Sequence, residues 1–210
     1  MPRIPAPAWS CGHNGAVRAT TSRPPGWLVA CKVLLAALLL TGALFPDVGG
    51  FAGKGMAYRL PVFLAPALVV PIIWWRRRGP YPAALDAALT LPFLLDTAAN
   101  AVGLYDHLDA TDDILHFVNW FVLVGGITAT WVARSDASTP RWLLVMAGAG
   151  FGAIAIIFWE VAEYSIMRSG VGGLDLTYAD TLGDLVLSTT GGALGALAAV
   201  RFTTGSNPHG

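Results

Sequence analysis

The residues of this sequence that could do chemistry are carboxylates spaced to share one face of a helix. Glu160 and Glu163 are three residues apart, and no basic residue stands three or four residues from either, which excludes a simple helical salt bridge. Asp180 and Asp184 are four residues apart. Asp180 could equally serve as a helix N-cap, whereas Asp184 lies one turn further in and needs another explanation. Such pairs are typical of acid–base catalysis or cation binding.

A histidine stands among acidic residues with the same helical spacing. His116 follows Asp112 by four residues and Asp113 by three, and Asp96 precedes Asn100 by four. If the helices bring these groups to similar depth, the like charges need compensation by protonation, by a basic residue or by a bound cation. Carboxylates with one imidazole suit Mg²⁺, Mn²⁺, Ca²⁺ or Zn²⁺.

These residues form one candidate site with two kinds of role. His116 or Glu163 is the candidate general base, and Arg59 is the nearby basic residue that could neutralise the acids. The candidate metal ligands are Asp113, His116, Glu160, Glu163, Asp180 and Asp184, with Asp96 and Asp112 as possible additions. Asp106, Asp109 and Asp175 are interpreted as solvated loop residues, and Asp86 is expected to snorkel to the interface without a role.

Long apolar segments must position these groups. Of 210 residues, 55% are hydrophobic and 12% charged, and the mean hydropathy is +0.59, which excludes a disordered chain, a nucleic-acid-binding protein and an ordinary soluble enzyme. A helix that spans the roughly 30 Å bilayer core needs about 20 apolar residues. We therefore predict an all-α, polytopic membrane protein. Its bundle of six transmembrane helices covers 27–45, 57–75, 83–104, 114–133, 142–167 and 181–202. Disordered tails are predicted at 1–26 and 203–210.

Basic residues predict the orientation of the bundle. Of 13 Lys and Arg residues, three (Lys54, Arg59 and Arg168) fall at one end of the segments and ten at the other. Because basic residues collect on the cytoplasmic side, both termini are predicted to be cytoplasmic. The loops near 46–56, 105–113 and 168–180 would then face outward, and most of the acidic residues lie toward that side.

Small residues predict close helix packing near the acids. Gly191 and Gly195 form one small-x-x-x-small pair, and Gly148 and Gly152 form another. Tight packing of the last two segments would bring the Glu160 pair near Asp184.

An ordered set of motifs carries a family resemblance over roughly residues 60–200. The motifs are Tyr105-Asp106, Asp113-Ile114-Leu115-His116-Phe117, Glu160-Val161-Ala162-Glu163, and Asp180-Thr181-Leu182-Gly183-Asp184 with Gly191-Gly192-Ala193 downstream. This set resembles the YjdF-like family of small bacterial inner-membrane proteins and is more distantly similar to VanZ-like proteins, which are associated with glycopeptide resistance. The resemblance implies a multi-pass fold in the bacterial cytoplasmic membrane and a candidate site at these motifs. Asp96 and Asn100 depart from the pattern.

Three functions are compatible with these residues. The first is a metal-dependent membrane enzyme that acts on a lipid or lipid-linked substrate at the outer leaflet. The second is a proton- or cation-coupled transporter, and the third is a non-catalytic accessory, sensor or resistance protein whose acids bind a structural cation. The acids lie mostly toward one side, which favours a site over a transport path. The substrate, the reaction, the oligomeric state and the question of enzymatic activity stay open at this point.

Overall fold

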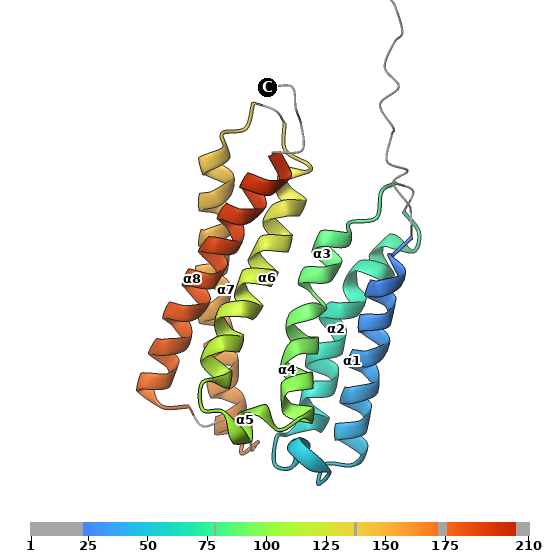
Figure 1. The fold of residues 1–210 in the computed structure, drawn as a ribbon, viewed down its shortest axis with the longest axis vertical. Coiled ribbons are helices and arrows are strands. Elements are labelled where there is room, and N and C mark those ends of the chain that lie inside the picture. The colour runs from blue at the N-terminus through green and yellow to red at the C-terminus, as the bar shows by residue number, and fades with distance from the viewer. Residues whose placement is uncertain (1–22, 78, 137, 172–175, 205–210) are drawn as a thin grey trace, which may run out of the picture.

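The computed structural model describes residues 23–77, 79–136, 138–171 and 176–204, and every regular element in these ranges is helical (Figure 1). The elements are α1 (Gly26–Leu44), η1 (Gly49–Phe51), α2 (Met56–Trp74), α3 (Ala83–Ala88), α4 (Leu91–Ala101), α5 (Leu104–His107), α6 (Thr111–Val132), α7 (Arg141–Arg168) and α8 (Tyr178–Thr204). The predicted tails fall largely outside the described residues, as does Asp175.

Five helices in the described part of the chain are long and apolar enough to cross a membrane, namely α1, α2, α6, α7 and α8. The segment 83–104, which the sequence predicts as one more spanning helix, is instead divided into α3 and α4. Figure 1 shows these two short helices stacked end to end beside α2. A continuous helix over 83–104 is therefore wrong, although the segment follows the expected course along the bundle.

The break between α3 and α4 has a local cause. Pro92 has no N–H to donate, and its ring would clash with the Ala88 carbonyl in a continuous helix. The Thr90 amide donates to the Ala87 carbonyl, three residues back, at 3.1 Å, which is the hydrogen-bond pairing of a 3₁₀ turn. The Thr90 hydroxyl then donates to the Asp86 carbonyl at 2.7 Å and satisfies the group that the broken helix leaves open.

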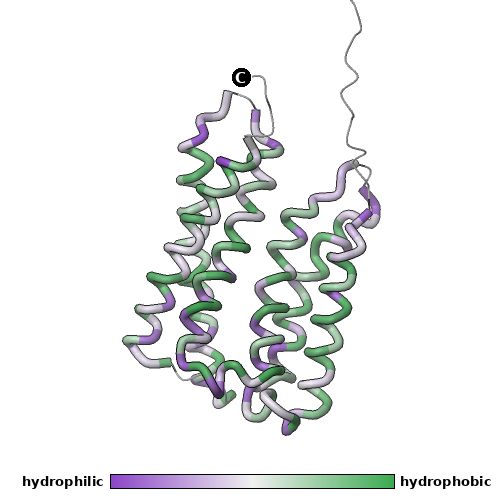
Figure 2. Tube along the Cα trace, in the orientation of Figure 1, coloured by the Kyte–Doolittle hydropathy of each residue, from purple (hydrophilic) through white to green (hydrophobic). Residues whose placement is uncertain are grey.

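Helix α6 joins two halves of the bundle. On one side it packs against α3 and α4, which lie with α1 and α2, and on the other it packs against α7 and α8 (Figure 1). Helix α1 begins and α8 ends at one end of the bundle, while η1 and α5 lie at the opposite end. Figure 2 shows apolar residues along the length of α1 and α2. Large side chains such as Val33, Ile72 and Phe158 are exposed on the outside of the bundle, as expected for a surface that faces lipid.

The predicted close packing at the small residues is confirmed, but their closest contacts are with α6 and not between the last two helices. A Cβ atom on Gly191 would lie 2.2 Å from the Phe117 carbonyl oxygen, and one on Gly195 would lie 2.3 Å from the Phe121 carbonyl oxygen. A Cβ atom on Gly148 of α7 would lie 2.3 Å from Thr128 Oγ1, also on α6. Both small-residue pairs therefore bring α7 and α8 close to α6, in addition to the contact between α7 and α8 themselves.

Candidate functional site

A cavity of about 980 Å³ lies between the two halves of the bundle. Residues of α2, α4, α5, α6, α7 and α8 line it, and its polar residues come from the end of the bundle that carries η1 and α5. The charged residues, histidine and asparagines among the lining residues are Lys54, Arg59, Asp96, Asn100, Asp109, Asp112, His116, Asn119, Glu163, Asp180 and Asp184. The structure thus gathers most of the predicted site residues around one space.

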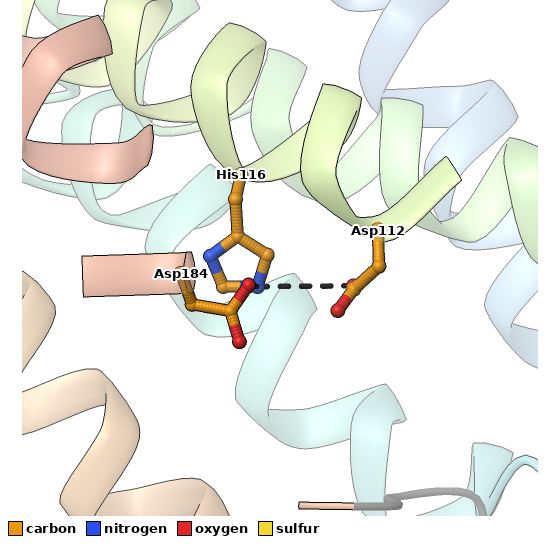
Figure 3. A group of neighbouring side chains, drawn as sticks. All are labelled: Asp112, His116 and Asp184. Atoms are coloured by element: carbon orange, nitrogen blue, oxygen red, sulfur yellow. Dashed lines mark ion pairs between the residues drawn. The ribbon is translucent and has the colours of Figure 1, made fainter. Parts of the chain in front are cut away.

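His116 is the centre of the first group of possible ligands (Figure 3). Its Nε2 atom lies 3.7 Å from Asp112 Oδ1 and 3.6 Å from Asp184 Oδ1, so that α6 and α8 both contribute a carboxylate. Its Nδ1 atom lies 3.0 Å from Ser188 Oγ. When Nδ1 donates its proton to this hydroxyl, Nε2 carries the lone pair and faces the two carboxylates, which is the orientation that a metal-binding imidazole needs.

The register of α8 against α6 produces this group. Asp184, Ser188 and Gly191 follow one another at intervals of four and three residues and share one face of α8. Gly191 of α8 lies against the Phe117 carbonyl of α6. Ser188, one turn earlier on α8, therefore lies beside His116, and Asp184, one turn earlier still, lies beside the same histidine. A glycine two turns away therefore sets the geometry of the site.

Glu160 and Glu163 form a second group with the same histidine. One ligand atom from each of His116, Glu160 and Glu163 lies within 4.8 Å of the others. The Glu160 residue is only 6% exposed, and neither of its carboxylate oxygens has a hydrogen-bond partner among the described residues. A buried polar group without a partner is costly, and it is the observation here that points most directly to a ligand.

Asp96, a possible additional ligand, is neutralised by other residues. Arg59 Nη1 lies 2.8 Å from Asp96 Oδ2, and the Tyr105 hydroxyl donates to Asp96 Oδ1 at 2.6 Å. The Asn100 amide adds a longer contact of 3.3 Å to Oδ2. Arg59 is the basic residue that is expected from the sequence to compensate the acids. Among the described residues, Asp96 is the one candidate acid with which it forms an ion pair. The carboxylates around His116 are left without that basic partner.

Two further predicted ligands lie at helix starts. Asp113 is exposed in the first turn of α6 and belongs to neither group, and Asp180 lines the cavity in the first turn of α8. Helix α8 begins at Tyr178, and the Asp180 amide donates to Thr177 Oγ1 at 3.2 Å. The alternative that Asp180 is the N-cap is therefore wrong, because Thr177 takes that role. Among the predicted loop acids, Asp106 forms an ion pair with Lys54 at 2.7 Å.

Sequence reasoning missed a buried polar group between α1, α2 and α3. Lys32 Nζ lies 2.7 Å from Asp86 Oδ1 and 2.7 Å from Thr90 Oγ1, and it also donates to the Ala67 carbonyl. The Tyr81 hydroxyl donates to Asp86 Oδ2 at 2.6 Å, and burial together with this bond raises the pKa of Tyr81 above its usual range.

Asp86 is 0% exposed, so the expectation that it snorkels to the interface is wrong. The distribution of basic residues predicts a cytoplasmic position for Lys32, yet its ammonium group lies inside the bundle, paired with Asp86. The signal that could have found the pair was a lysine inside an apolar run, with an acid and a threonine at i,i+4 on another segment.

Fold and site together define a class of protein. Apolar helices that surround a cavity with buried acids make this chain a multi-pass integral membrane protein with a polar site inside the bundle. The chain belongs to the predicted membrane protein family DUF2238, because the model of that family matches residues 26–205, from the start of α1 through α8. No match was found among curated proteins or among solved structures. The resemblance to YjdF-like and VanZ-like proteins stays a prediction.

Proposed function

We propose that this protein binds a divalent cation at His116, within the cavity of its helical bundle. The observation that carries the proposal is Glu160, a buried carboxylate whose two oxygens lack a partner and lie beside a histidine and a second glutamate. A cation supplies the positive charge and the ligand bonds that these groups need. The two basic residues that line the cavity already have acidic partners, because Arg59 pairs with Asp96 and Lys54 pairs with Asp106.

The donor set limits the kind of cation. One imidazole and several carboxylates suit Zn²⁺, Mn²⁺, Mg²⁺ or Ca²⁺, because thiolate ligands are missing from both groups. Asp112 and Asp184 would hold the cation together with His116, or Glu160 and Glu163 would hold it together with the same histidine. Ser188 would orient the imidazole from behind.

We further propose that the protein lies in the cytoplasmic membrane of a bacterium, with six crossings and both termini in the cytoplasm. Support comes from α3 and α4, which together run alongside α2, and from the start of α1 and the end of α8 at the same end of the bundle (Figure 1). The excess of basic residues toward that end gives the direction. The cavity mouth would then open on the extracytoplasmic side.

A metal-dependent enzyme that acts on a lipid or lipid-linked substrate is the activity we favour for this site. A bound cation would supply Lewis-acid polarisation of a substrate oxygen. Glu163 lines the cavity, is half-buried and lies beside His116, so either residue could take a proton from water at the mouth. The deepest lining residues include Phe93, Leu123 and Trp159, all apolar, which favours a closed site over a transport path.

Cation-dependent thermal stability tests the proposal. A cation at a hundred times its Kd stabilises the folded state by about 2.7 kcal/mol, or roughly 5–11 °C for a chain of this size. We expect such a shift for the purified wild-type protein with at least one of Mg²⁺, Mn²⁺, Ca²⁺ or Zn²⁺, and its loss in Glu160→Gln. Asp106→Asn, which removes an exposed acid outside both groups, should keep the shift. No shift in wild type, or an equal shift in Glu160→Gln, would overturn the proposal.

A further inference from the structure

The chemistry of the cavity changes with depth. Asp112 lies at its outer end and Leu123 at its inner end on the same helix, so that the cavity reaches about 17 Å along α6 at 1.5 Å per residue. The inner end is aromatic. The ring centroids of Phe63 and Phe93 are 5.0 Å apart, and each lies 6.3 Å from the centroid of Trp159. We call these three rings the aromatic floor.

The exposure of several lining residues indicates that the cavity opens toward the outside of the bundle between α2 and α7. Tyr58 and Val62 of α2 line the cavity and are nevertheless 63% and 45% exposed, and Ala162 of α7 lines it and is exposed as well. Helix α2 packs on α1 and α3, whereas α7 packs on α6 and α8, and the described parts of α2 and α7 do not pack extensively on each other. Phe63 of α2 and Trp159 of α7 approach each other at the floor.

We propose that a phosphate-bearing membrane lipid enters the cavity sideways between α2 and α7. Its phosphate would lie beside His116 and its acyl chain against the aromatic floor. This inference rests on the proposed cation site, because a phosphate among carboxylates needs the charge of a cation between them. Arg59, which lines the cavity and stacks over Phe63 at 5.5 Å, lies between the polar mouth and the floor and adds a donor for the headgroup.

A lipid fits these features better than a water-soluble ligand does. Inward of Asn119 the cavity is lined by apolar and aromatic side chains, which give a small polar molecule little to bind, whereas an acyl chain is stabilised by burial against them. A depth of about 17 Å reaches roughly the middle of the 30 Å hydrocarbon core, which matches the length of one leaflet. A side opening between the mouth and the floor lies within this leaflet and faces the lipid itself.

Photocrosslinking of a lipid inside the cavity tests the inference. The full chain is reconstituted in nanodiscs of phosphatidylethanolamine that contain phosphatidylglycerol with a diazirine at the end of one acyl chain. After illumination, mass spectrometry locates the crosslinked peptides. We expect crosslinks at the aromatic floor, for example at Phe93 or Trp159. Ala162→Trp, which narrows the opening, should reduce them to background, whereas Ala147→Trp, at an exposed position near the other end of α7, should leave them unchanged.

The outcomes separate the lipid inference from the cation site. Crosslinks confined to outward-facing residues such as Val33 and Ile72, with cation-dependent stability retained, overturn the lipid inference alone. Floor crosslinks that persist at wild-type yield in Glu160→Gln and with a chelator show that a lipid enters without a cation, which overturns the cation's role in holding the phosphate. Floor crosslinks that Ala162→Trp does not reduce overturn the proposed route between α2 and α7.

Discussion

Removing the ammonium group of Lys32 should destabilise the bundle strongly. In Lys32→Met, Asp86 stays fully buried and loses its ionic partner, and the Ala67 carbonyl and the Thr90 hydroxyl lose a donor. Breaking a buried ion pair by removing one partner costs about 3–5 kcal/mol. The hydrogen bond from Tyr81 to Asp86 remains, so we expect a loss near the lower end of that range.

A double-mutant cycle isolates the interaction free energy between Lys32 and Asp86. Asp86→Asn removes the other charge, and the double variant Lys32→Met/Asp86→Asn leaves no buried charge, so we expect it to recover most of the loss seen in Lys32→Met. The assay is thermal unfolding in mild detergent, in which 3–5 kcal/mol corresponds to about 6–20 °C in Tm for a chain of this length.

A matched control makes the prediction sharper. Lys54→Met removes a lysine from an ion pair of the same length, 2.7 Å, but Asp106 in that pair is exposed, so its loss should cost at most about 1 kcal/mol. The reasoning is refuted if Lys32→Met is no less stable than Lys54→Met, or if the double variant is no more stable than Lys32→Met.

The remaining predictions concern packing and topology. Gly191→Ala places a Cβ atom 2.2 Å from a backbone oxygen of α6, so it should lower stability by about 1–3 kcal/mol and weaken cation binding, because α8 must shift. Gly150→Ala meets nothing within 4 Å and should be neutral or slightly stabilising, and equal effects of the two substitutions would contradict the packing described. In an otherwise cysteine-free chain, a membrane-impermeant thiol reagent should label Asp109→Cys in intact cells and Ser135→Cys only after permeabilisation. The reverse pattern would invert the proposed topology.

The parts of the site that sequence could predict are those set by spacing within one helix. His116 lies one turn from Asp112, and Glu160 lies three residues from Glu163, so their shared faces follow from helical geometry. An acidic residue within an apolar membrane segment is costly to expose to lipid, so it must face the interior of the bundle. This reasoning places Asp184 in the same cavity as His116 and Glu163. The position of the site therefore follows from local periodicity and burial.

Interactions between segments far apart in the sequence could not be predicted in the same way. Lys32 and Asp86 are 54 residues apart, and Arg59 and Asp96 are 37 apart, so their pairing depends on which helix faces meet. The division of 83–104 just before Pro92 carries a visible signal, because a proline cannot continue a preceding helix without a break in its hydrogen bonds. Prolines inside α2, such as Pro66, do not interrupt that helix, so the residue type alone does not decide the outcome.

The metal content of the purified protein tests the central claim most directly. Elemental analysis is made on the detergent-solubilised wild type, on the double variant Glu160→Gln/Asp184→Asn, and on Asp106→Asn as the control that changes an acid outside both ligand groups. We expect about one divalent ion per chain in the wild type and the control, and its loss in a folded double variant. A folded wild-type protein without a divalent ion after exposure to all four cations, or a double variant that retains the ion, would contradict the account.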